Sequence, residues 1–512
     1  MEYIVPALQA VFTPYGLAVI FLGALFGILC GAMPGLSAIM AMTILMPFTF
    51  RLEGMYGILM LLGVFCGAVY GGSITAILIN TPGTANSAAT ALDGYPMARS
   101  GQPDRALSIS TSSSCFGGVF GSLCLLFTAP LLAKLCVNFG VSEYFALAIF
   151  GLSIVTSVSN KSVIKGIIGA ILGLLLGTVG IDTLSATQRF TFNTTYLLAG
   201  IAFVPLLIGL YALAQCFVTS EGDIEEMGLV RKVKLKQILP SRHDIKRCLP
   251  VALGCSILGT IIGAIPGTGG DIASWVGYNE TKRWVRNNEK PFGEGTPEGI
   301  AAPEAANNSI VGGALIPLLS LGIPGDAGTA LLLGALMLKG ITPGPLLFTN
   351  QGVKVYTIIV GLMVANIAFA ILGFLGIRVF AKIGNLPQKW LTPMIFMFCA
   401  VGTFALNNNF GDVIFMVIAG ILGYFLIKMD FSMPPIILGL LLGNTVESNL
   451  RRALTIANGD LTYFLHRPVT IVLLSISAIS LVYPVIAPYL KKAKAGKKTA
   501  SGEEPAEDKS GR

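Results

Sequence analysis

Apolar runs close to the length of a bilayer crossing recur along almost the whole chain, and the polar segments between them are short. In the first half the expected helices span 14–33, 36–50, 55–80, 83–95, 106–133, 141–158, 162–181 and 195–218. In the second half they span 250–265, 268–280, 300–322, 325–340, 355–382, 390–407, 412–428, 431–446 and 467–490. The pattern therefore predicts an all-α polytopic membrane protein.

Four of the expected helices are too short to cross a bilayer comfortably. They are 36–50, 83–95, 268–280 and 325–340. We interpret them as half-helices or re-entrant arms, which leaves about ten to twelve transmembrane helices.

Each of these short segments begins at or directly after a Pro-Gly pair, and the pairs occur in a repeated order. The segment GILCGAMPGLS (27–37) is followed by TPGT (81–84), and GTIIGAIPGTGGD (259–271) is followed by IPGD (323–326). The two copies lie about 230–240 residues apart, a spacing that indicates an internal duplication. The sequence thus predicts two structural repeats, each containing two Pro-Gly-interrupted helices, as in secondary transporters.

Pro-Gly inside an apolar run unwinds the helix, because proline has no N–H to donate and glycine permits a positive φ. The break leaves free N–H groups on the next half-helix, which attract a carboxylate, and free carbonyls on the preceding one, which attract Na⁺. For a single break the alternative is a plain proline kink. The candidate substrate-binding residues are Pro34, Gly35, Leu36, Ser37, Pro82, Gly83, Thr84, Pro266, Gly267, Thr268, Gly269, Gly270, Pro324 and Gly325.

Polar side chains near the breaks are the candidate ligands of a coupling ion. An ionisable residue within a membrane segment is costly and indicates a functional site by default. The Na⁺ candidates are Ser37, Asn80, Asp271, Asp326, Thr329, Glu304, Asn307 and Asn308. Two alternatives stay open: aspartate is a good helix N-cap, which is the favoured interpretation for Asp326, and Glu304 can mark a helix start near the interface.

Composition and charge agree with a membrane protein. Hydrophobic residues make up 54% of the 512 residues and charged residues only 12%. Basic residues concentrate in the central segment 231–247 and at 491–498, which the positive-inside rule places in the cytoplasm. These segments explain the net charge of +8, so the charge argues for topology and against nucleic-acid binding.

The same segments divide the chain. We expect a first membrane half at 1–220, a basic cytoplasmic loop at 221–249, a second membrane half at 250–490 and a disordered cytoplasmic tail at 491–512. The chain has no Lys or Arg before Arg51, which favours an outside start and inverted repeats. Basic residues at 282–290 complicate that assignment, so inverted and parallel repeats both stay open.

Three motifs resemble those of the large membrane subunit (TctA-like permease) of the tripartite tricarboxylate transporter family: GAMPGLS (31–37), GAIPGTGG (263–270) and GIAAPEAANN (299–308) followed by GGALIP (312–317). The resemblance covers nearly the whole chain. It implies a bacterial inner-membrane permease that imports tricarboxylates, dicarboxylates or related organic acids, working with a small four-span membrane subunit and a periplasmic solute-binding protein. Uptake would be driven by a gradient of Na⁺, or of H⁺, without ATP or a cofactor. The family motifs cover Pro34, Gly35, Ser37, Pro266, Gly267, Thr268, Gly269, Gly270, Glu304, Asn307 and Asn308.

Two other classes of function fit the sequence less well. A membrane-embedded aspartyl protease needs Gly-x-Gly-Asp, but Thr268 stands where the first glycine of that motif belongs. No HExxH, GxSxG or Walker A element is present, so we expect neither an enzyme nor an ATP-driven pump. A passive channel would use a ring of filter residues from several subunits, whereas duplication within one chain favours a carrier that works by alternating access.

Overall fold

The computed structural model describes residues 2–33, 35–158, 162–182, 184–221, 239–286, 288–380 and 388–483. Within these ranges the chain is almost entirely helical, and its one sheet is a two-stranded hairpin. The all-α fold class is therefore confirmed. Pro34, most of the predicted central loop (222–238) and the predicted tail (491–512) lie outside the described residues.

Seven described helices are long and apolar enough to cross a membrane, and six shorter apolar helices accompany them. The long ones are Pro14–Gly31, Tyr56–Ile79, Pro103–Cys136, Phe203–Glu221, Arg242–Ala264, Gly352–Gly376 and Phe410–Lys428. The shorter ones are Ala38–Phe50, Val141–Thr156, Val163–Gly177, Ala327–Leu338, Thr392–Asn407 and Pro468–Tyr483.

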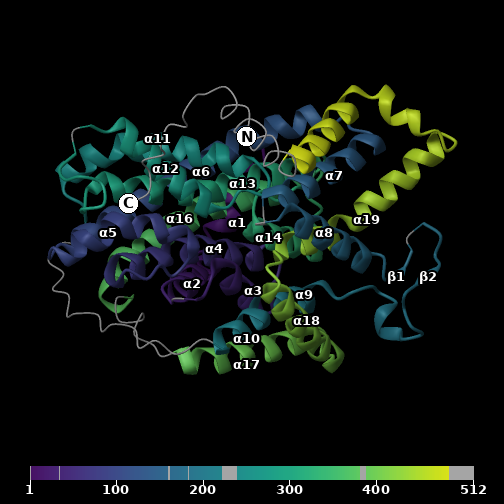
Figure 1. Ribbon diagram of the computed structural model, residues 1–512, viewed down its shortest axis with the longest axis horizontal. Helices are drawn as coiled ribbons and strands as arrows, with labels where there is room; N and C mark the ends of the chain where they lie inside the picture. Colours follow the sequence, from purple (N-terminus) through teal and green to yellow (C-terminus); the bar gives the residue numbers. More distant parts are fainter. Residues whose placement is uncertain are drawn as a thin grey trace, which may run out of the picture.

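Two sets of helices far apart in the sequence form the central body of the molecule (Figure 1). The first set is α1 (Ile4–Val11), α2 (Pro14–Gly31), α3 (Ala38–Phe50), α4 (Tyr56–Ile79), η1 (Ala85–Ser87), α5 (Ala88–Arg99) and α6 (Pro103–Cys136). The second set is α11 (Arg242–Ala264), α12 (Gly270–Trp284), α13 (Pro297–Leu321), α14 (Ala327–Leu338), α15 (Leu347–Asn350) and α16 (Gly352–Phe380).

The two sets interlock. Helix α2 packs along α4, and α11 packs along α13 in the same way. The last long helix of each set crosses to the other one, since α6 packs against α11 and α13 while α16 packs against α2 and α4. Neither set therefore buries its apolar surface without the other.

The remaining helices form two smaller groups beside the central body (Figure 1). In one group α7 (Val141–Val158) and α8 (Val163–Gly177) pack against α19 (Met433–Ile456). In the other, α9 (Phe203–Leu207), the π-helix η3 (Ile208–Leu213) and α10 (Ala214–Glu221) pack against α17 (Gln388–Asn407) and α18 (Phe410–Lys428). The hairpin of β1 (Gly180–Ile181) and β2 (Gln188–Arg189), with η2 (Thr195–Leu197) after it, connects α8 to α9, and η5 (Leu461–His466) follows α19.

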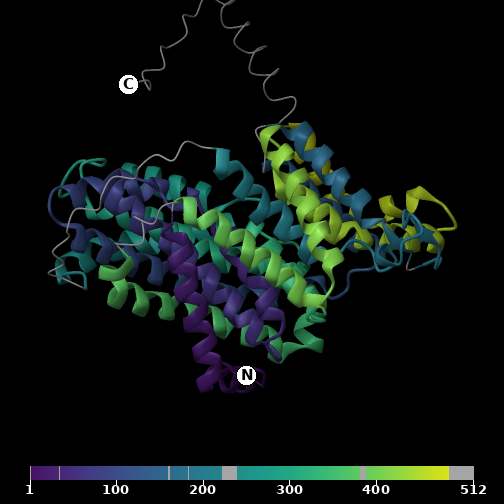
Figure 2. The ribbon, with the colours of Figure 1, turned by 90° about the horizontal axis from the view of Figure 1, so that it is seen from below.

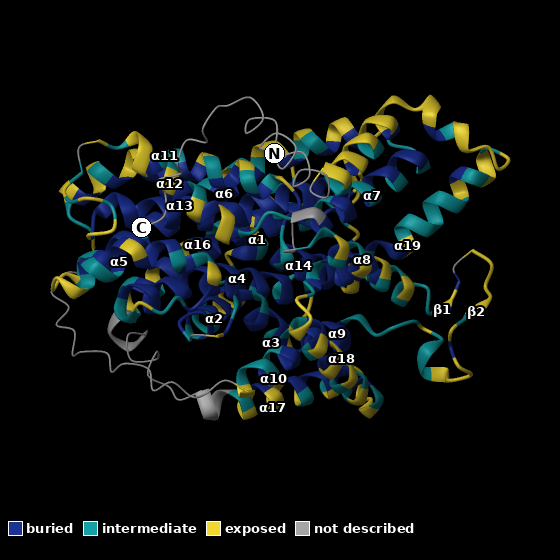
Figure 3. Cartoon of the chain, in the orientation of Figure 1, coloured by how far each residue is buried: buried dark blue, intermediate teal, exposed yellow. Residues whose placement is uncertain are grey.

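Burial separates the central helices from the outer ones (Figure 3). Helix α13 is buried at every position from Pro297 to Ser320, and most of α4 is buried too. At the outer surface large apolar side chains are exposed, even on helices of the central body, as in Phe127 of α6 at 72% and Leu375 of α16 at 76%. An apolar outer surface around a buried core is what a protein surrounded by lipid needs.

Close helix packing depends on glycines at regular spacing. Gly23, Gly27 and Gly31 of α2 all face the backbone of α4, where a Cβ at each position would lie 2.3 Å from a carbonyl oxygen. Such clashes leave room only for glycine, because the two helix backbones are in direct contact.

Two opposite ends of the central body serve as reference points. We name one end the Arg105 face, where Arg105 pairs with Asp244 at 2.6 Å and with Glu289 at 2.7 Å. We name the other end the Lys339 face, where the Nζ of Lys339 donates to the backbone carbonyls of Phe50 at 3.0 Å and Leu52 at 2.6 Å.

The central helices of the two sets run in opposite directions between these faces. Helix α4 starts at the Lys339 face directly after Leu52, and α5 ends at the Arg105 face, where Met97 packs against Gly295. Helix α13 starts at the Arg105 face, where Glu298 pairs with Arg247 of α11 at 2.6 Å, and α14 ends at Lys339. Figure 2 shows the N-terminus at one edge of the helical body.

Candidate substrate and ion site

The predicted breaks interrupt the helices. Helix α2 ends at Gly31 and α3 begins at Ala38, while α11 ends at Ala264 and α12 begins at Gly270. Gly35 and Gly267 have the same φ of 88°, in the left-handed region that glycine adopts without strain. Both breaks therefore contain a glycine with a positive φ, as the sequence indicated.

The downstream breaks also interrupt the helices. Helix α4 ends at Ile79, where Asn80 takes a left-handed φ of 57°, and α13 ends at Leu321, where Gly322 takes a φ of 76°. The chain resumes in η1 and α5 after the first of these breaks and in α14 after the second. The predicted half-helices correspond to α3, η1 with α5, α12 and α14.

The two breaks within each half of the chain pack directly on one another. A Cβ on Gly83 would lie 2.0 Å from the carbonyl oxygen of Gly31, and the N–H of Gly83 donates to the carbonyl of Gly72 at 3.1 Å. In the second half a Cβ on Gly325 would lie 2.6 Å from the carbonyl oxygen of Gly263. The carbonyl of Gly325 accepts from the N–H of Gly267 at 2.7 Å.

Half-helices also meet across the two halves of the chain. Helix α3 contacts α14, and α12 contacts η1 and α5. Half-helices that are far apart in the sequence are thereby packed against one another in the central body.

A cavity of about 190 Å³ lies where the last two breaks meet. Its lining includes two of the predicted acidic residues, Asp271 and Asp326, together with the backbone of Gly267 and Gly269. The full lining is Val155, Gly267, Gly269, Asp271, Ile272, Asp326, Ala327, Pro434 and Leu438. Ser37, Asn80, Thr84, Glu304, Asn307 and Asn308 do not line it.

Several candidate substrate and ion ligands make local hydrogen bonds. Asp326 caps α14, since its Oδ1 accepts from the N–H of Thr329 at 2.7 Å and its own N–H donates to the Thr329 hydroxyl at 2.9 Å. Ser37 caps α3 by accepting from the N–H of Met40 at 3.1 Å. The hydroxyl of Thr268 donates to the carbonyl of Ile265 at 2.8 Å. The capping interpretation of Asp326 is therefore the one that the geometry supports.

Glu304 lies inside α13, fully buried, and not at a helix start near the interface. Its Oε1 accepts from the hydroxyls of Ser73 at 2.5 Å and Thr90 at 2.6 Å, and its Oε2 accepts from Ser114 at 2.5 Å. These donors belong to α4, α5 and α6, so one carboxylate connects four helices. Within the described part of the chain, Glu304 has no Lys or Arg partner.

The two asparagines that follow Glu304 are less well satisfied. Both side chains are 1% exposed. Asn308 donates to the carbonyl of Glu304 at 3.0 Å, but its Oδ1 has no partner within the described residues. For Asn307, neither Oδ1 nor Nδ2 has one. Buried amides without hydrogen bonds are rare and call for an explanation.

Sequence analysis missed one residue of this region. This residue is Asn86 in η1, whose side chain lies beside Gly270. A Cβ on Gly270 would lie 2.5 Å from the Nδ2 of Asn86 and also 2.5 Å from the Oδ1 of Asn307. The hydroxyl of Ser274 donates to the carbonyl of Asn86 at 2.6 Å and ties η1 to α12. The sequence feature that could have indicated Asn86 is its position as a polar residue shortly after the break at Pro82.

Ion pairs at the Arg105 face hold the loop before α13 against α6 and α11. Arg105 contacts Asp244 of α11 and Glu289 of the loop before α13. Hydrogen bonds from Arg105 lower the pKa of Glu289 below its ordinary value of 4.5. His243 lies near both carboxylates, but Arg105 already occupies them, so this cluster is an ion-pair network and not a metal site.

Comparisons with known proteins agree with this architecture. The model of the "Tripartite tricarboxylate transporter TctA family" matches residues 17–438. An "Uncharacterized 52.8 kDa protein in TAR-I ttuC' 3'region" of Agrobacterium vitis is 38% identical over 479 residues, covering 93% of this chain and 95% of the relative. An "Uncharacterized protein in TAR-II ttuC' 3'region" of the same organism is 37% identical over 228 residues, covering 44% of this chain and 94% of the relative. No solved structure matches the chain.

The family match confirms the resemblance drawn from the three motifs and the prediction that the chain is not an enzyme. It also agrees with the helices long enough to cross a membrane, so this is a multi-pass membrane protein. The chain belongs to the TctA family, the membrane permeases of tripartite tricarboxylate transporters.

Proposed function

We propose that this chain is the permease subunit of a binding-protein-dependent secondary transporter that imports tricarboxylates, dicarboxylates or related organic acids. Its partners are a small four-span membrane subunit and a periplasmic solute-binding protein, and it lies in a bacterial inner membrane. The observation that carries the proposal is the 190 Å³ cavity in which two Pro-Gly breaks meet Asp271 and Asp326. Unwound backbone beside carboxylates inside a membrane body is typical of an ion-coupled carrier.

The two halves form inverted repeats in this proposal. Supporting it, Gly35 and Gly267 share the same φ, and Gly83 packs on Gly31 as Gly325 packs on Gly263. The exchange of α6 and α16 between the halves, and the opposite directions of α4 and α13, are what a two-fold axis in the membrane plane would produce.

Orientation follows from charge. Arg105, Lys246 and Arg247 lie at or near the Arg105 face, and the loop that carries Arg286 and Lys290 reaches the same face through Glu289. The basic residues that complicated the sequence argument therefore belong with those of the central loop. The positive-inside rule then makes the Arg105 face cytoplasmic, together with the loop 221–249 and the tail 491–512.

Transport uses opposite charges in one site. The carboxylate of the substrate binds N–H groups that remain free near half-helix N-termini, within the segments 34–37, 82–84, 266–270 and 324–325. The N–H groups of Gly83 and Gly267 are not among them, because they donate to backbone carbonyls. Na⁺ binds the neighbouring carboxylates Asp271 and Asp326 with backbone carbonyls, and so offsets the substrate charge in a low-dielectric setting. The loaded site is then exposed alternately to the two sides of the membrane.

Reconstitution tests the proposal. The permease, with both partner subunits, is placed in proteoliposomes and given labelled citrate, succinate and benzoate with and without a Na⁺ gradient. We expect uptake of at least one carboxylate that collapses with the Na⁺ gradient and needs no ATP. Uptake that follows a H⁺ gradient alone would assign the coupling to H⁺, and uptake indifferent to both gradients would indicate a channel.

A further inference from the structure

Two places in the molecule are built from the same kinds of element, and only one of them is polar. One lies near the start of α3 at Ala38, where α14 packs against α3 and Gly328 of α14 approaches Phe65 of α4. The other lies at the start of α12, where Gly270, Asn307 of α13 and Asn86 of η1 come together.

The positions correspond one to one along the chain. Phe65 stands as far before Pro82 as Asn307 stands before Pro324. In the same way, Asn86 stands as far after Pro82 as Gly328 stands after Pro324. Ala38 likewise follows Pro34 as Gly270 follows Pro266. The two places therefore differ in side chains and not in construction.

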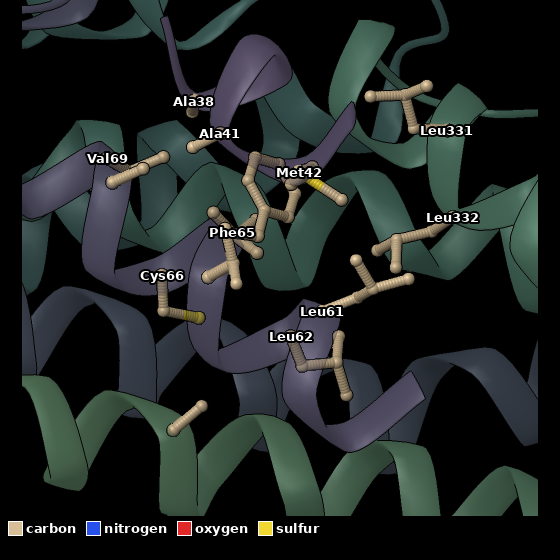
Figure 4. Close-up of a cluster of buried hydrophobic side chains, with 14 of the residues drawn as sticks. Ala38, Ala41, Met42, Leu61, Leu62, Phe65, Cys66, Val69, Leu331 and Leu332 are labelled. Atoms are coloured by element: carbon tan, nitrogen blue, oxygen red, sulfur yellow. The ribbon is translucent and has the colours of Figure 1, made fainter. Parts of the chain in front are cut away.

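The first place is closed by an aromatic ring. A Cβ on Gly328 would lie 2.5 Å from Cζ of Phe65, and that ring is 3% exposed. Figure 4 shows Phe65 surrounded by apolar side chains of α3, α4 and α14, including Met42 and Leu332. None of the three residues that define this place, Ala38, Phe65 and Gly328, has a side-chain hydrogen-bond donor.

The second place offers unused donors. Asn307 is 1% exposed and has no partner for either side-chain atom within the described residues. Turning its amide over exchanges Oδ1 and Nδ2 at no loss of hydrogen bonds, so Asn307 can present its nitrogen toward Gly270. The Nδ2 of Asn86 already faces the same point.

The helix at this place selects for negative charge. Helix α12 is 15 residues long, and its first N–H groups have no partners within the helix. The N-terminal end of a helix carries partial positive charge, which attracts an anion and repels a cation. Two amide nitrogens that converge on such an end complete a set of donors suited to a carboxylate.

We propose that Asn86 and Asn307, one from each half of the chain, bind a carboxylate group of the transported anion at the N-terminus of α12, and that Phe65 closes the corresponding place at α3. The permease then has one anion site and not two. This inference rests on the proposed function, because it specifies which half-helix and which side chains hold the substrate.

The cavity beside this place supplies access and the counter-ion. Gly269 and Asp271, on either side of Gly270, both line the 190 Å³ cavity, so the anion site is one residue away from open space. A cation held by Asp271 and Asp326 would lie next to the bound carboxylate. Substrate and coupling ion thus stabilise one another across the tip of α12.

The test compares Asn307→Leu and Asn86→Leu with Phe65→Leu, which introduces the same residue at the corresponding apolar place. Initial uptake of the best carboxylate of the panel is measured in proteoliposomes with both partner subunits, at saturating loaded binding protein and varied Na⁺. We expect each asparagine variant to lower the maximal rate at least about tenfold, since a hydrogen bond to a charged group is lost. The half-saturating Na⁺ concentration should not fall, because neither amide is an ion ligand in this proposal. Phe65→Leu should stay within about twofold of the wild type.

Asn307→Asp guards against a folding defect, because it keeps the size of the side chain. Its negative charge repels a carboxylate, so we expect uptake to be lost. A lower half-saturating Na⁺ concentration with retained uptake would overturn the proposal and make Asn307 an ion ligand. So would wild-type rates in both leucine variants.

Different results would contradict the amide site and the proposed transport function on which it rests. If the wild-type complex imports no carboxylate of the panel, the proposed function fails. If the wild type shows gradient-driven uptake and both asparagine variants match it at equal protein abundance, only the amide site is wrong.

Discussion

Helices α4 and α13 are the two central helices of the molecule, and they differ in what they bury. Each packs along a neighbour with closely approaching glycines, and each ends before a Pro-Gly pair. Three positions of α4, counted back from Pro82, correspond to three positions of α13, counted back from Pro324. They are Leu62 with Glu304, Phe65 with Asn307, and Cys66 with Asn308. All six side chains are almost completely buried. At these positions one helix buries apolar side chains and the other buries a carboxylate and two amides.

We infer from this difference that the second half carries the proposed ligand-binding residues and that the first half supports them. Burying polar groups costs free energy unless they are paired, so the apolar set in α4 stabilises the fold outright. Glu304 offsets its cost with three hydroxyl donors from other helices. Asn307 has no such compensation, which is why we assign the ligand to it and a connecting role to Glu304.

The largest effect is expected at Glu304. Glu304→Ala leaves the hydroxyls of Ser73, Thr90 and Ser114 buried without their acceptor. At about 1–3 kcal/mol for each orphaned group, the free energy of unfolding should fall by roughly 3 kcal/mol or more. Unfolding of the purified permease in detergent measures it. Leu62→Ala is the control at the corresponding position, with an expected cost of about 2–5 kcal/mol from the cavity alone.

Glu304→Gln separates a connecting role from ion binding. It keeps the volume and one carbonyl acceptor, so stability should lie between those of the wild type and Glu304→Ala. A variant that unfolds like the wild type but has lost Na⁺ dependence would show instead that Glu304 is an ion ligand.

The second effect is expected at the paired glycines with φ of 88°. Gly35→Ala and Gly267→Ala should each lower the free energy of unfolding by about 1–2 kcal/mol, because a Cβ strains a left-handed conformation. Only Gly267→Ala should also lower carboxylate uptake, since Gly267 lines the cavity and a Cβ there would lie 3.0 Å from Cα of Val155. Equal loss of uptake in the two variants would contradict the asymmetry between the halves.

A third effect concerns the tip of α12 alone. Gly270→Ala places a methyl group 2.5 Å from both Asn86 and Asn307, which displaces the amides from the tip. We expect carboxylate uptake to fall about tenfold, corresponding to roughly 1.4 kcal/mol of lost substrate binding. Ala38→Gly is the matched reverse change at the start of α3 and should leave uptake unchanged. If Ala38→Gly impaired uptake as much as Gly270→Ala, the α3 place would also bind substrate.

The smallest effect distinguishes the two ends of the central body. The pKa of Glu289 is lowered chiefly by hydrogen bonds from Arg105, so this contact is fully present above the ordinary pKa of 4.5 and is lost as pH falls through the lowered value. As pH falls through this lowered pKa, the fluorescence of Trp284, which precedes the loop of Glu289, should therefore change. Arg105→Met should abolish the change. At the Lys339 face the partners are backbone carbonyls, which do not titrate in this range.

Much of the helical architecture was predictable from local signals. Apolar runs and Pro-Gly pairs predicted where helices exist and where they stop, because proline and glycine act on the backbone at their own positions. The role of Asp326 as a helix cap was also the favoured interpretation. The exchange of α6 and α16 between the halves was not predictable, since it depends on packing between surfaces far apart in the sequence.

The candidate site was predicted in part. Asp271, Asp326, Gly267 and Gly269 do line one cavity. The surroundings of Glu304 were missed because serine and threonine are common in membrane helices and their hydroxyls carry no distinctive pattern. Asn86 was missed because its importance depends on Asn307, which approaches it only through the tertiary fold.

The central claim is tested most directly by a cryo-EM map of the complete complex with the imported carboxylate of the panel and Na⁺ bound. We predict density for a carboxylate group within hydrogen-bonding distance of Asn86, Asn307 and the first N–H groups of α12, and none beside Phe65. Carboxylate density at the start of α3, or at neither place in a complex loaded with substrate, would contradict the account.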